Sequence, residues 1–314
     1  MSSNSSAPEP VLQGSVSGFR KLLKPASVSR MWGYLFVLPF MVAFIVFRLY
    51  PSFYAVWLSM LDYKALGQST FVGFDNYVSM LTYEQFWTSL KNTALYVLMV
   101  VPTGMAMSFF TAVLIYSLRK DSVRQFFMAA FYLPGVISGL AVAILWRFIF
   151  DFEVGLLNWV LAQFELAPVA WLGNIRTALP ALAIMSLVGG GGGSIIIFVA
   201  ALGGIPTELY DAATVDGAGA WRKLTRITLP LLVPAMLYVM VVSTIGAFQV
   251  FIPVYVLTSG GPANATMTVA YFIYRRVFYY QDLGSAAATG LLLLIATVGF
   301  TVIQFRRFSQ VVEF

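Results

Sequence analysis

The stretch "ELYDAATVDGAGAWRKLTRITLP" (residues 208–230) is a polar interruption in an otherwise apolar chain. Pro206, just before it, suits the first position of a helix, and the acidic residues near its start suit the positive end of a helix dipole. Gly217 is expected to end or bend that helix. We therefore predict a helix of about ten residues, roughly 15 Å long, and a second helical piece that leads to Pro230. The charged residues of the whole stretch are Glu208, Asp211, Asp216, Arg222, Lys223 and Arg226.

The rest of the chain has the composition of a membrane protein. Of its 314 residues 60% are hydrophobic and 10% are charged, whereas about a quarter of the residues of a soluble domain are charged. A run of about 20 apolar residues is long enough to cross a bilayer as a helix. The sequence therefore predicts an all-α membrane protein with six transmembrane helices, near residues 34–61, 93–118, 125–150, 178–202, 229–257 and 284–305.

The distribution of Lys and Arg predicts how these segments are oriented. Twelve basic residues fall in the two tails and in the loops after the second and fourth segments, against six on the opposite side, where Arg147 near the end of the third segment is included. Because cytoplasmic loops carry the excess of basic residues, both termini and residues 208–230 are predicted to be cytoplasmic. The expected organisation is a largely disordered cytoplasmic tail (1–31), a six-span domain (32–308) with the loop 203–228, and a short cytoplasmic tail (309–314). The net charge of +6 is thus mostly a topology signal, and we expect no nucleic-acid partner.

The absence of certain residue types from the sequence argues against several classes of function. It contains no His and no Cys, and every Asp and Glu lies outside the six predicted segments. A membrane enzyme would lack its ordinary catalysts, and no metal site is expected. An ion-coupled secondary transporter is the remaining alternative, although such proteins usually carry an intramembrane carboxylate. The glycine run at 188–197 has no Lys followed by Ser or Thr and no strand–loop–helix context, both of which a phosphate-binding loop needs, so we expect no ATP site there.

The predicted polar helix has one narrow face of small residues. Leu209, Ala212, Ala213 and Asp216 recur at three- and four-residue spacing. So short a helix is marginal by itself in water and is expected to pack on something. A small face suits a groove-shaped protein partner. The alternative is an interfacial helix whose nearby basic residues face lipid phosphates, and the residues alone leave both readings open.

The same stretch resembles the signature of permease subunits of ATP-binding-cassette importers. The likeness runs through Ala212, Ala213, Asp216, Gly217, Ala218, Ile227, Leu229 and Pro230, while Asp211 stands where that family usually has Glu. Further motifs in matching order are similar to the carbohydrate-importing branch: "FVGFDNY" (71–77), "FWTSLKNT" (86–93), "LWRFIF" (145–150), "GLLN" (155–158), "AALGGIPTELYDAA" (200–213) and "VLTSGGP" (256–262).

The resemblance implies a type I importer permease fold with a cytoplasmic coupling helix seated on an ATPase subunit. The residues it assigns to coupling are Glu208, Asp211, Ala212, Ala213, Asp216, Gly217 and Ala218. It also implies a second permease subunit, two ATPase subunits that bind ATP and Mg²⁺, and an external substrate-binding protein. This chain would then be a non-catalytic subunit without a cofactor of its own, embedded in lipid in a bacterial cytoplasmic membrane.

Candidates for the substrate path lie inside the predicted segments. Gly190 and Gly192, in the glycine run, allow either close helix packing or a break that opens backbone groups to substrate. Gln249 would either hydrogen-bond a neighbouring helix or line the path. Tyr132 and Tyr255 are weaker candidates, for which packing is favoured. The aromatic outer loops predict short helices at the membrane interface, with docking of an external partner as the alternative.

Overall fold

The computed structural model describes residues 25–64 and 69–309. The chain divides into two compact units, Met1–Ala55 and Val56–Phe314. Its helices and strands are α1 (Pro25–Phe44), α2 (Tyr50–Leu58), β1 (Leu61–Asp62), β2 (Thr70–Phe71), α3 (Asp75–Thr82), α4 (Glu84–Tyr116), α5 (Asp121–Tyr132), α6 (Gly139–Ile149), α7 (Leu156–Gln163), α8 (Ala178–Gly190), α9 (Gly192–Gly203), α10 (Thr207–Val215), α11 (Ala220–Lys223), α12 (Leu229–Phe248), α13 (Val269–Phe278) and α14 (Leu283–Ser309).

The first unit contains one long apolar helix. A π-helical turn, η2 (Ile45–Leu49), joins α1 to α2, so that residues 34–58 form one continuous candidate span. Pro51 follows this turn, and a wide turn accommodates a residue that has no N–H to donate. Residues 25–31, expected in the disordered tail, instead form the first turns of α1. The expectation for residues 1–24 lies outside the described residues.

Within the described ranges, four helices are long and apolar enough to cross a membrane, and two bent helix pairs bring the number to six if each pair is one span. The six predicted segments therefore correspond to four helices and two bent pairs. The single helices differ from the prediction mainly at their ends. In particular, α4 begins at Glu84 rather than near residue 93. In its first turns the buried Asn92 amide donates to the Met267 carbonyl, and the buried Thr93 hydroxyl accepts from the N–H of Val269 at the start of α13.

Two of the six predicted segments, 125–150 and 178–202, are bent helix pairs rather than single helices. The first bends by 92° between the 3₁₀ turn η3 (Leu133–Val136) and α6. Pro134 and Gly135 lie in that turn, and both residue types weaken a helix interior. The second pair, α8 and α9, bends by 50° at Gly191. This break falls within the glycine run and reorients the second half of the span.

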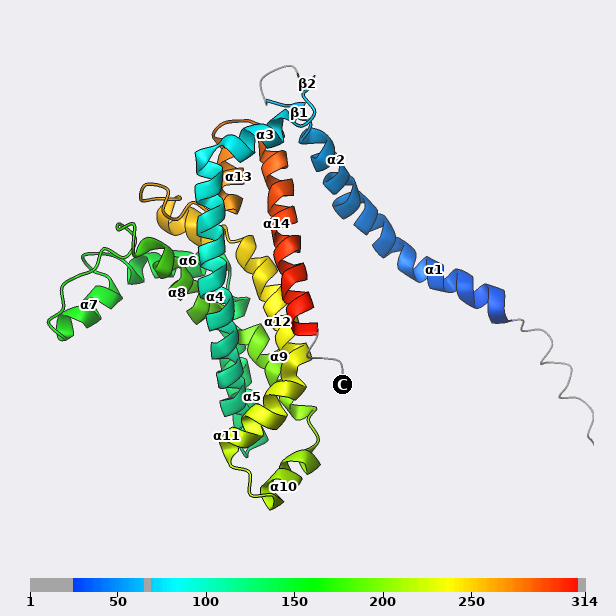
Figure 1. Ribbon diagram of the computed structural model, residues 1–314, viewed down its shortest axis with the longest axis vertical. Helices are drawn as coiled ribbons and strands as arrows, with labels where there is room; N and C mark the ends of the chain where they lie inside the picture. The colour runs from blue at the N-terminus through cyan, green and yellow to red at the C-terminus, as the bar shows by residue number, and fades with distance from the viewer. Residues whose placement is uncertain (1–24, 65–68, 310–314) are drawn as a thin grey trace, which may run out of the picture. The chain divides into compact units, whose positions relative to one another are not determined.

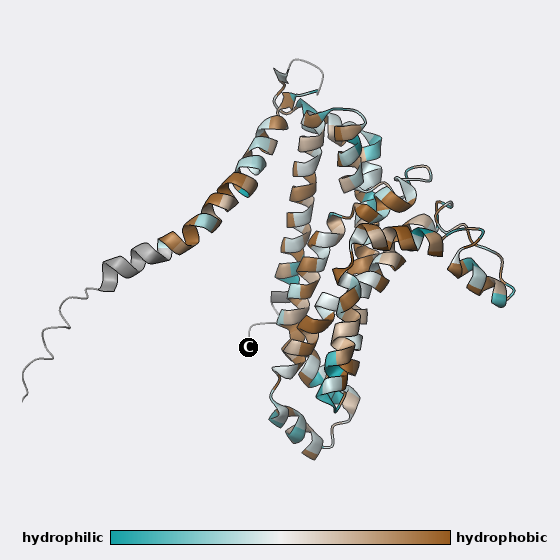
Figure 2. Cartoon of the chain, turned by 180° about the vertical axis from the view of Figure 1, so that it is seen from behind, coloured by the Kyte–Doolittle hydropathy of each residue, from teal (hydrophilic) through white to brown (hydrophobic). Residues whose placement is uncertain are grey.

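The second unit is a helical bundle in which α4, α9, α12 and α14 lie side by side (Figure 1). Figure 2 shows hydrophobic residues along these helices and more hydrophilic ones toward the α10 end. Two clusters of buried apolar side chains form the core. The second cluster, which includes Phe198, Leu202 and Leu232, joins α4, α9 and α12 near α10. Burial of these side chains holds the base of the bundle together.

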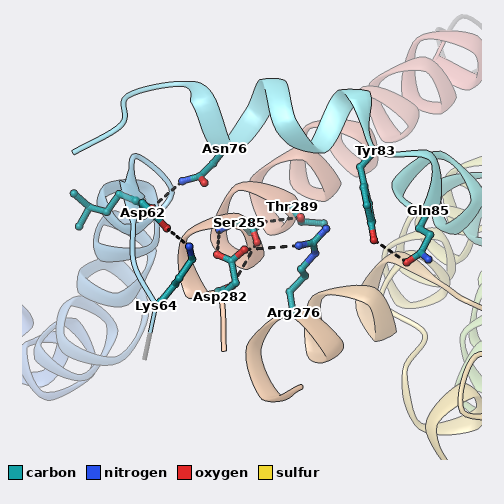
Figure 3. Close-up of polar contacts among 10 residues, drawn as sticks. Asp62, Lys64, Asn76, Tyr83, Gln85, Arg276, Asp282, Ser285 and Thr289 are labelled. Carbon is teal, nitrogen blue, oxygen red and sulfur yellow. Dashed lines mark hydrogen bonds and ion pairs between the residues drawn. The ribbon is translucent and has the colours of Figure 1, made fainter. Parts of the chain in front are cut away.

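The opposite end of the unit is closed by a group of polar contacts, drawn in Figure 3. Arg276 and Asp282 form an ion pair of 3.7 Å, and the Arg276 guanidinium lies 4.7 Å from the centroid of the Tyr83 ring. The Asn76 amide donates to the Leu61 carbonyl at 2.8 Å. The short antiparallel pair β1–β2 and helix α3 are thereby attached to α13 and α14.

Two of the aromatic loops contain short helices, as the sequence predicts. Helix α3 lies in the first loop and α7 in the second. The buried Asn158 side chain organises the second loop: its amide donates to the carbonyls of Phe152 and Val169, each at 3.0 Å, and its oxygen accepts from the Trp171 indole at 2.9 Å. One buried amide thus satisfies three partners and fixes the loop, which carries exposed apolar side chains on α7.

Candidate functional site

Helix α10 and the turn after it form the polar interruption seen in the sequence. Pro206 precedes the helix as its cap, one position earlier than predicted, and Gly217 follows it with φ of +72°. The Ala218 N–H donates to the Ala213 carbonyl at 2.8 Å, and the Gly217 N–H donates to the Thr214 carbonyl at 3.0 Å. These two bonds with a left-handed residue between them define a Schellman motif, which glycine adopts without strain. The predicted helix end at Gly217 is confirmed.

The outer surface of α10 is exposed and carries both acidic and apolar groups. Val215 is 88% exposed and Trp221, just after the turn, is 74% exposed. Exposed apolar groups of this size at the tip of a loop mark an interaction surface. The predicted coupling residues lie on this helix and its turn: Glu208, Asp211, Ala212, Asp216 and Gly217 are exposed, and Ala213 and Ala218 are half-buried.

A cavity of about 490 Å³ lies in the bundle, away from α10. Its walls come from α4, from the break between α8 and α9, from one face of α12 formed by Ser243, Gly246 and Ala247, and from Val250 just after that helix. Phe131 and Pro253 complete the lining. The described lining residues carry no charged side chain, so the cavity is suited to a neutral or weakly polar molecule.

Hydroxyl groups make this apolar cavity partly polar. The Tyr96 hydroxyl lies 2.5 Å from Ser186 Oγ. Because Ser186 donates to the Leu182 carbonyl at 3.2 Å, Tyr96 is the donor to Ser186. Ser108 Oγ donates to the Gly191 carbonyl at 3.4 Å, at the break itself. The remaining hydroxyls of the lining belong to Thr111, Ser194 and Ser243.

None of these hydroxyl residues is among the path candidates predicted from the sequence. Ser186 and Ser194 flank the glycine run at residues 189–193. Because small polar residues within apolar spans commonly line helix contacts or aqueous paths, that flanking pattern was an available signal. Tyr96 could not have been found in this way, since it resembles the many other aromatic residues of the spans.

The glycine run contains both a packing glycine and a cavity glycine. A Cβ at Gly192 would collide with the Phe131 carbonyl oxygen and lie 2.8 Å from Tyr132 Cα. Gly192 is therefore required for the close approach of α9 to the end of α5. Gly190 lines the same cavity, but a Cβ there would meet no atom within 4 Å. Both glycines thus line the cavity, and of the two only Gly192 is required for close packing.

We expect Gly192→Ala to destabilise the protein and Gly190→Ala to be tolerated. Overpacking against rigid backbone costs about 1–3 kcal/mol, whereas an alanine at Gly190 has open space and improves helix propensity. Thermal unfolding of the two variants, purified in the same detergent, measures the difference. Equal melting temperatures for the variants would contradict the packing role assigned to Gly192.

The other predicted path residues lie apart from this cavity. Gln249 is exposed and lines a separate groove between α12 and α14, with Thr297 and Thr301. Tyr132 is exposed at the end of α5, and its backbone faces Gly192. Tyr255 belongs to an aromatic cluster beyond Pro253, where its ring stacks on Phe251 with centroids 5.4 Å apart. The structure thus brings Gly190 and Gly192 together at the cavity and leaves these three residues outside its lining.

Comparison with known proteins gives the relatives of this chain. The model of a family described as "Binding-protein-dependent transport system inner membrane component" matches residues 104–306. The probable ABC transporter permease protein YesP of Bacillus subtilis is 34% identical, over 90% of this chain and 92% of that protein. The arabinooligosaccharides transport system permease protein AraP of the same organism is 31% identical over 87% of each. The sn-glycerol-3-phosphate transport system permease protein UgpA of Shigella flexneri is 33% identical, over 93% of this chain and 98% of that one.

Among solved structures, a chain of a bacterial ABC transporter that imports the acidic polysaccharide alginate matches with a TM-score of 0.77. It is 25% identical, and the match covers 90% of this chain and 97% of that chain. The same transporter in complex with its pentasaccharide-bound periplasmic protein matches with a TM-score of 0.80. Each match covers about nine-tenths of this chain.

Proposed function

Because the chain belongs to the family of binding-protein-dependent transport system inner membrane components, we propose that it is a permease subunit of an ATP-driven carbohydrate importer. The observation that carries the proposal is α10, an exposed short helix with acidic, small and apolar residues at one end of a membrane bundle. Its relatives transport arabinooligosaccharides and glycerol 3-phosphate. The proposed substrate class is therefore a di- or oligosaccharide or a related sugar compound.

In this proposal α10 is the coupling helix that seats in a cleft of an ATPase subunit. Its docking surface comprises Glu208, Asp211, Ala212, Ala213, Asp216, Gly217 and Ala218. ATP and Mg²⁺ are held by two partner ATPase subunits, and this chain supplies no catalytic residue. The exposure of the helix and its rigid Schellman end support the role, since a docked helix must present a fixed surface.

The cavity supports a path for a polyhydroxylated molecule. Its hydroxyls offer hydrogen bonds to sugar hydroxyls, and its apolar wall suits the C–H faces of a sugar ring. Gly190 and the carbonyl of Gly191 lie on this path. Gly192 supports it by packing, and Gln249, Tyr132 and Tyr255 are retained as secondary candidates because each is exposed near the bundle.

The assembly that we propose contains a second, related permease subunit, two ATPase subunits and an external binding protein. The structural neighbour crystallised with a sugar-bound periplasmic protein supports the last of these. Binding and hydrolysis of ATP would bias the pair of permeases between inward- and outward-open states. The chain is placed in a bacterial cytoplasmic membrane, with both termini and α10 on the cytoplasmic side, in agreement with the excess of basic residues on that side.

An ion-coupled secondary transporter is not favoured. In the described candidate spans of the second unit, the acidic residues lie only at helix starts, at Glu84 and Asp121. Such residues are poor candidates for coupling ions across the bilayer centre. The lining of the cavity is likewise uncharged among the residues described.

Purification from native membranes tests this proposal. A tagged chain, extracted in mild detergent, is expected to bring an ATPase and a second permease in stoichiometric amounts, identified by mass spectrometry. Uptake into vesicles is then expected to need ATP and to survive dissipation of ion gradients. Recovery of the chain alone in every detergent, with uptake driven by an ion gradient, would instead establish the secondary-transporter alternative.

A further inference from the structure

We propose that four residues, Tyr210, Thr214, Lys223 and Thr228, form a hydrogen-bonded ring that transmits motion of α10 to helix α12 and so to the cavity. The proposal rests on the coupling role proposed for α10. It assigns a function to four residues outside the docking surface defined above. Thr228 is buried, Tyr210 and Lys223 are half-buried, and Thr214 is exposed.

The first half of the ring runs from α10 to the start of α12. The Tyr210 hydroxyl lies 2.9 Å from the Thr228 hydroxyl, and Thr228 is 5% exposed. Thr228 in turn donates to the Lys223 carbonyl at 3.4 Å. Since the Thr228 hydroxyl has one proton, Tyr210 is the donor in the bond between them.

The second half runs back to α10. The Lys223 ammonium donates to the Thr214 hydroxyl at 2.6 Å, and that hydroxyl donates to the Tyr210 carbonyl, also at 2.6 Å. The two halves form a closed ring. The first runs from the Tyr210 side chain to the Lys223 carbonyl, and the second runs from the Lys223 side chain to the Tyr210 carbonyl. Two residues of α10 are thereby tied to two residues of the segment that leads into α12. A bond from an ammonium is stronger than one between neutral groups.

The ring lies at an irregular turn of a continuous helix. Residues 220–248 form one candidate span, which contains the π-helical turn η4 (Leu224–Thr228). Such wide turns recur at functional sites in helices. From Thr228 the helix continues for about 27 Å, at 1.5 Å per residue, to Gly246 in the cavity wall. A displacement at the ring is therefore carried by a rigid helix into the wall of the cavity.

The chain leading into and out of α10 is poorly suited to transmit the same motion. Gly203 and Gly204 precede the helix, and Gly217 and Gly219 follow it. Glycines allow the backbone to change direction at low cost. The Tyr210 side chain packs against the core cluster together with Leu224 and Ile227. This packing and the ring of hydrogen bonds together connect α10 laterally to the bundle.

The experiment uses the complete complex. It depends on the absence of cysteine from this chain, so that a single introduced thiol is the only one in the chain. In a Ser243→Cys background, the cavity carries one thiol, whose rate of modification by a membrane-impermeant thiosulfonate reagent is measured in vesicles with and without ATP. We expect ATP to change this rate in the parent, which reports alternating access. Tyr210→Phe and Lys223→Met each remove one hydrogen bond of the ring, and Thr214→Val removes two. Each is expected to reduce the ATP-dependent ratio at least about fivefold, the equivalent of one hydrogen bond.

Two control variants make the same chemical change elsewhere. Tyr116→Phe removes a hydroxyl from another ring packed on the same core cluster. Thr225→Val removes a hydroxyl that bonds only within its own helix, to the Trp221 and Arg222 carbonyls. Both are expected to keep the parent ratio. Amount, melting temperature and ATPase subunits bound are measured for every variant, because a purely structural role would lower these and not the ratio.

The outcomes separate this inference from the function on which it rests. Retained ATPase subunits with a reduced ratio in the ring variants, and an unchanged ratio in the controls, support transmission through the ring. An unchanged ratio in all three ring variants overturns it, and so does loss of the ATPase subunits from those variants, which would make the ring part of docking. If the parent binds no ATPase, the proposed function itself fails.

Discussion

Replacing Asp211 with lysine is expected to reduce ATP-driven uptake by at least tenfold while the chain still inserts in the membrane. The exposed side chains of Glu208, Asp211 and Asp216 give the docking surface a formal charge of −3, which the substitution changes to −1. A partner matched to the acidic surface then meets a like charge. Such a juxtaposition costs several kcal/mol, and about 3 kcal/mol weakens association by about two orders of magnitude.

The helix itself is not expected to unfold in this variant. Lysine has a higher helix propensity than aspartate, and Asp211 is the fifth residue of α10, beyond the first turn where a helix dipole acts most strongly. Co-purification of the ATPase and uptake are measured together. Asp211→Glu, the residue that the resembling family usually has, is expected to keep both. Wild-type uptake by Asp211→Lys would remove Asp211 from the docking surface.

The sequence predicts the spans of this protein better than their interiors. Apolar runs report that a segment is buried in lipid or protein, and six such runs match four helices and two bent pairs. The 92° bend before α6 has a local cause in Pro134 and Gly135, and these two residues are visible in the sequence as a possible break. A span with a proline can also remain nearly straight, as α4 does with Pro102 inside it. Packing against neighbours decides between the two outcomes.

The site was predictable to different extents for similar reasons. The end of α10 follows from local chemistry, because a left-handed residue at a helix end favours glycine whatever surrounds it. The ring around Tyr210 requires that residues 18 positions apart come within 2.9 Å, which no local pattern encodes. The same holds for Tyr96 and Ser186, which are brought together from two helices. Gln249 is a candidate for the substrate path because it is polar within an apolar run, but that property does not determine which groove its side chain lines.

Replacing Gly246 with tryptophan is expected to bring uptake to background. Gly246 lies on the face of α12 that lines the cavity, and a Cβ there would meet no atom within 4 Å. The first atom of the new side chain therefore meets no neighbour, and helix propensity rises because glycine is the weaker former. The indole ring would occupy a large part of a cavity of about 490 Å³. Transport is blocked because the substrate and the indole cannot share this volume, which close packing around them prevents from expanding.

A matched variant distinguishes a blocked path from a failure of assembly. Gly299→Trp makes the same change in α14, where a Cβ also meets no atom within 4 Å but the residue lies outside the cavity lining. Uptake, ATP hydrolysis and the amount of assembled complex are measured for both variants and for Gly246→Ala, which is expected to transport. Loss of uptake in Gly246→Trp alone, with the complex intact, places the substrate path in this cavity. Normal uptake in that variant would place the path elsewhere. Equal losses in the two tryptophan variants would point to assembly, because only the indole at position 246 reaches the space between α4, the α8–α9 break and α12.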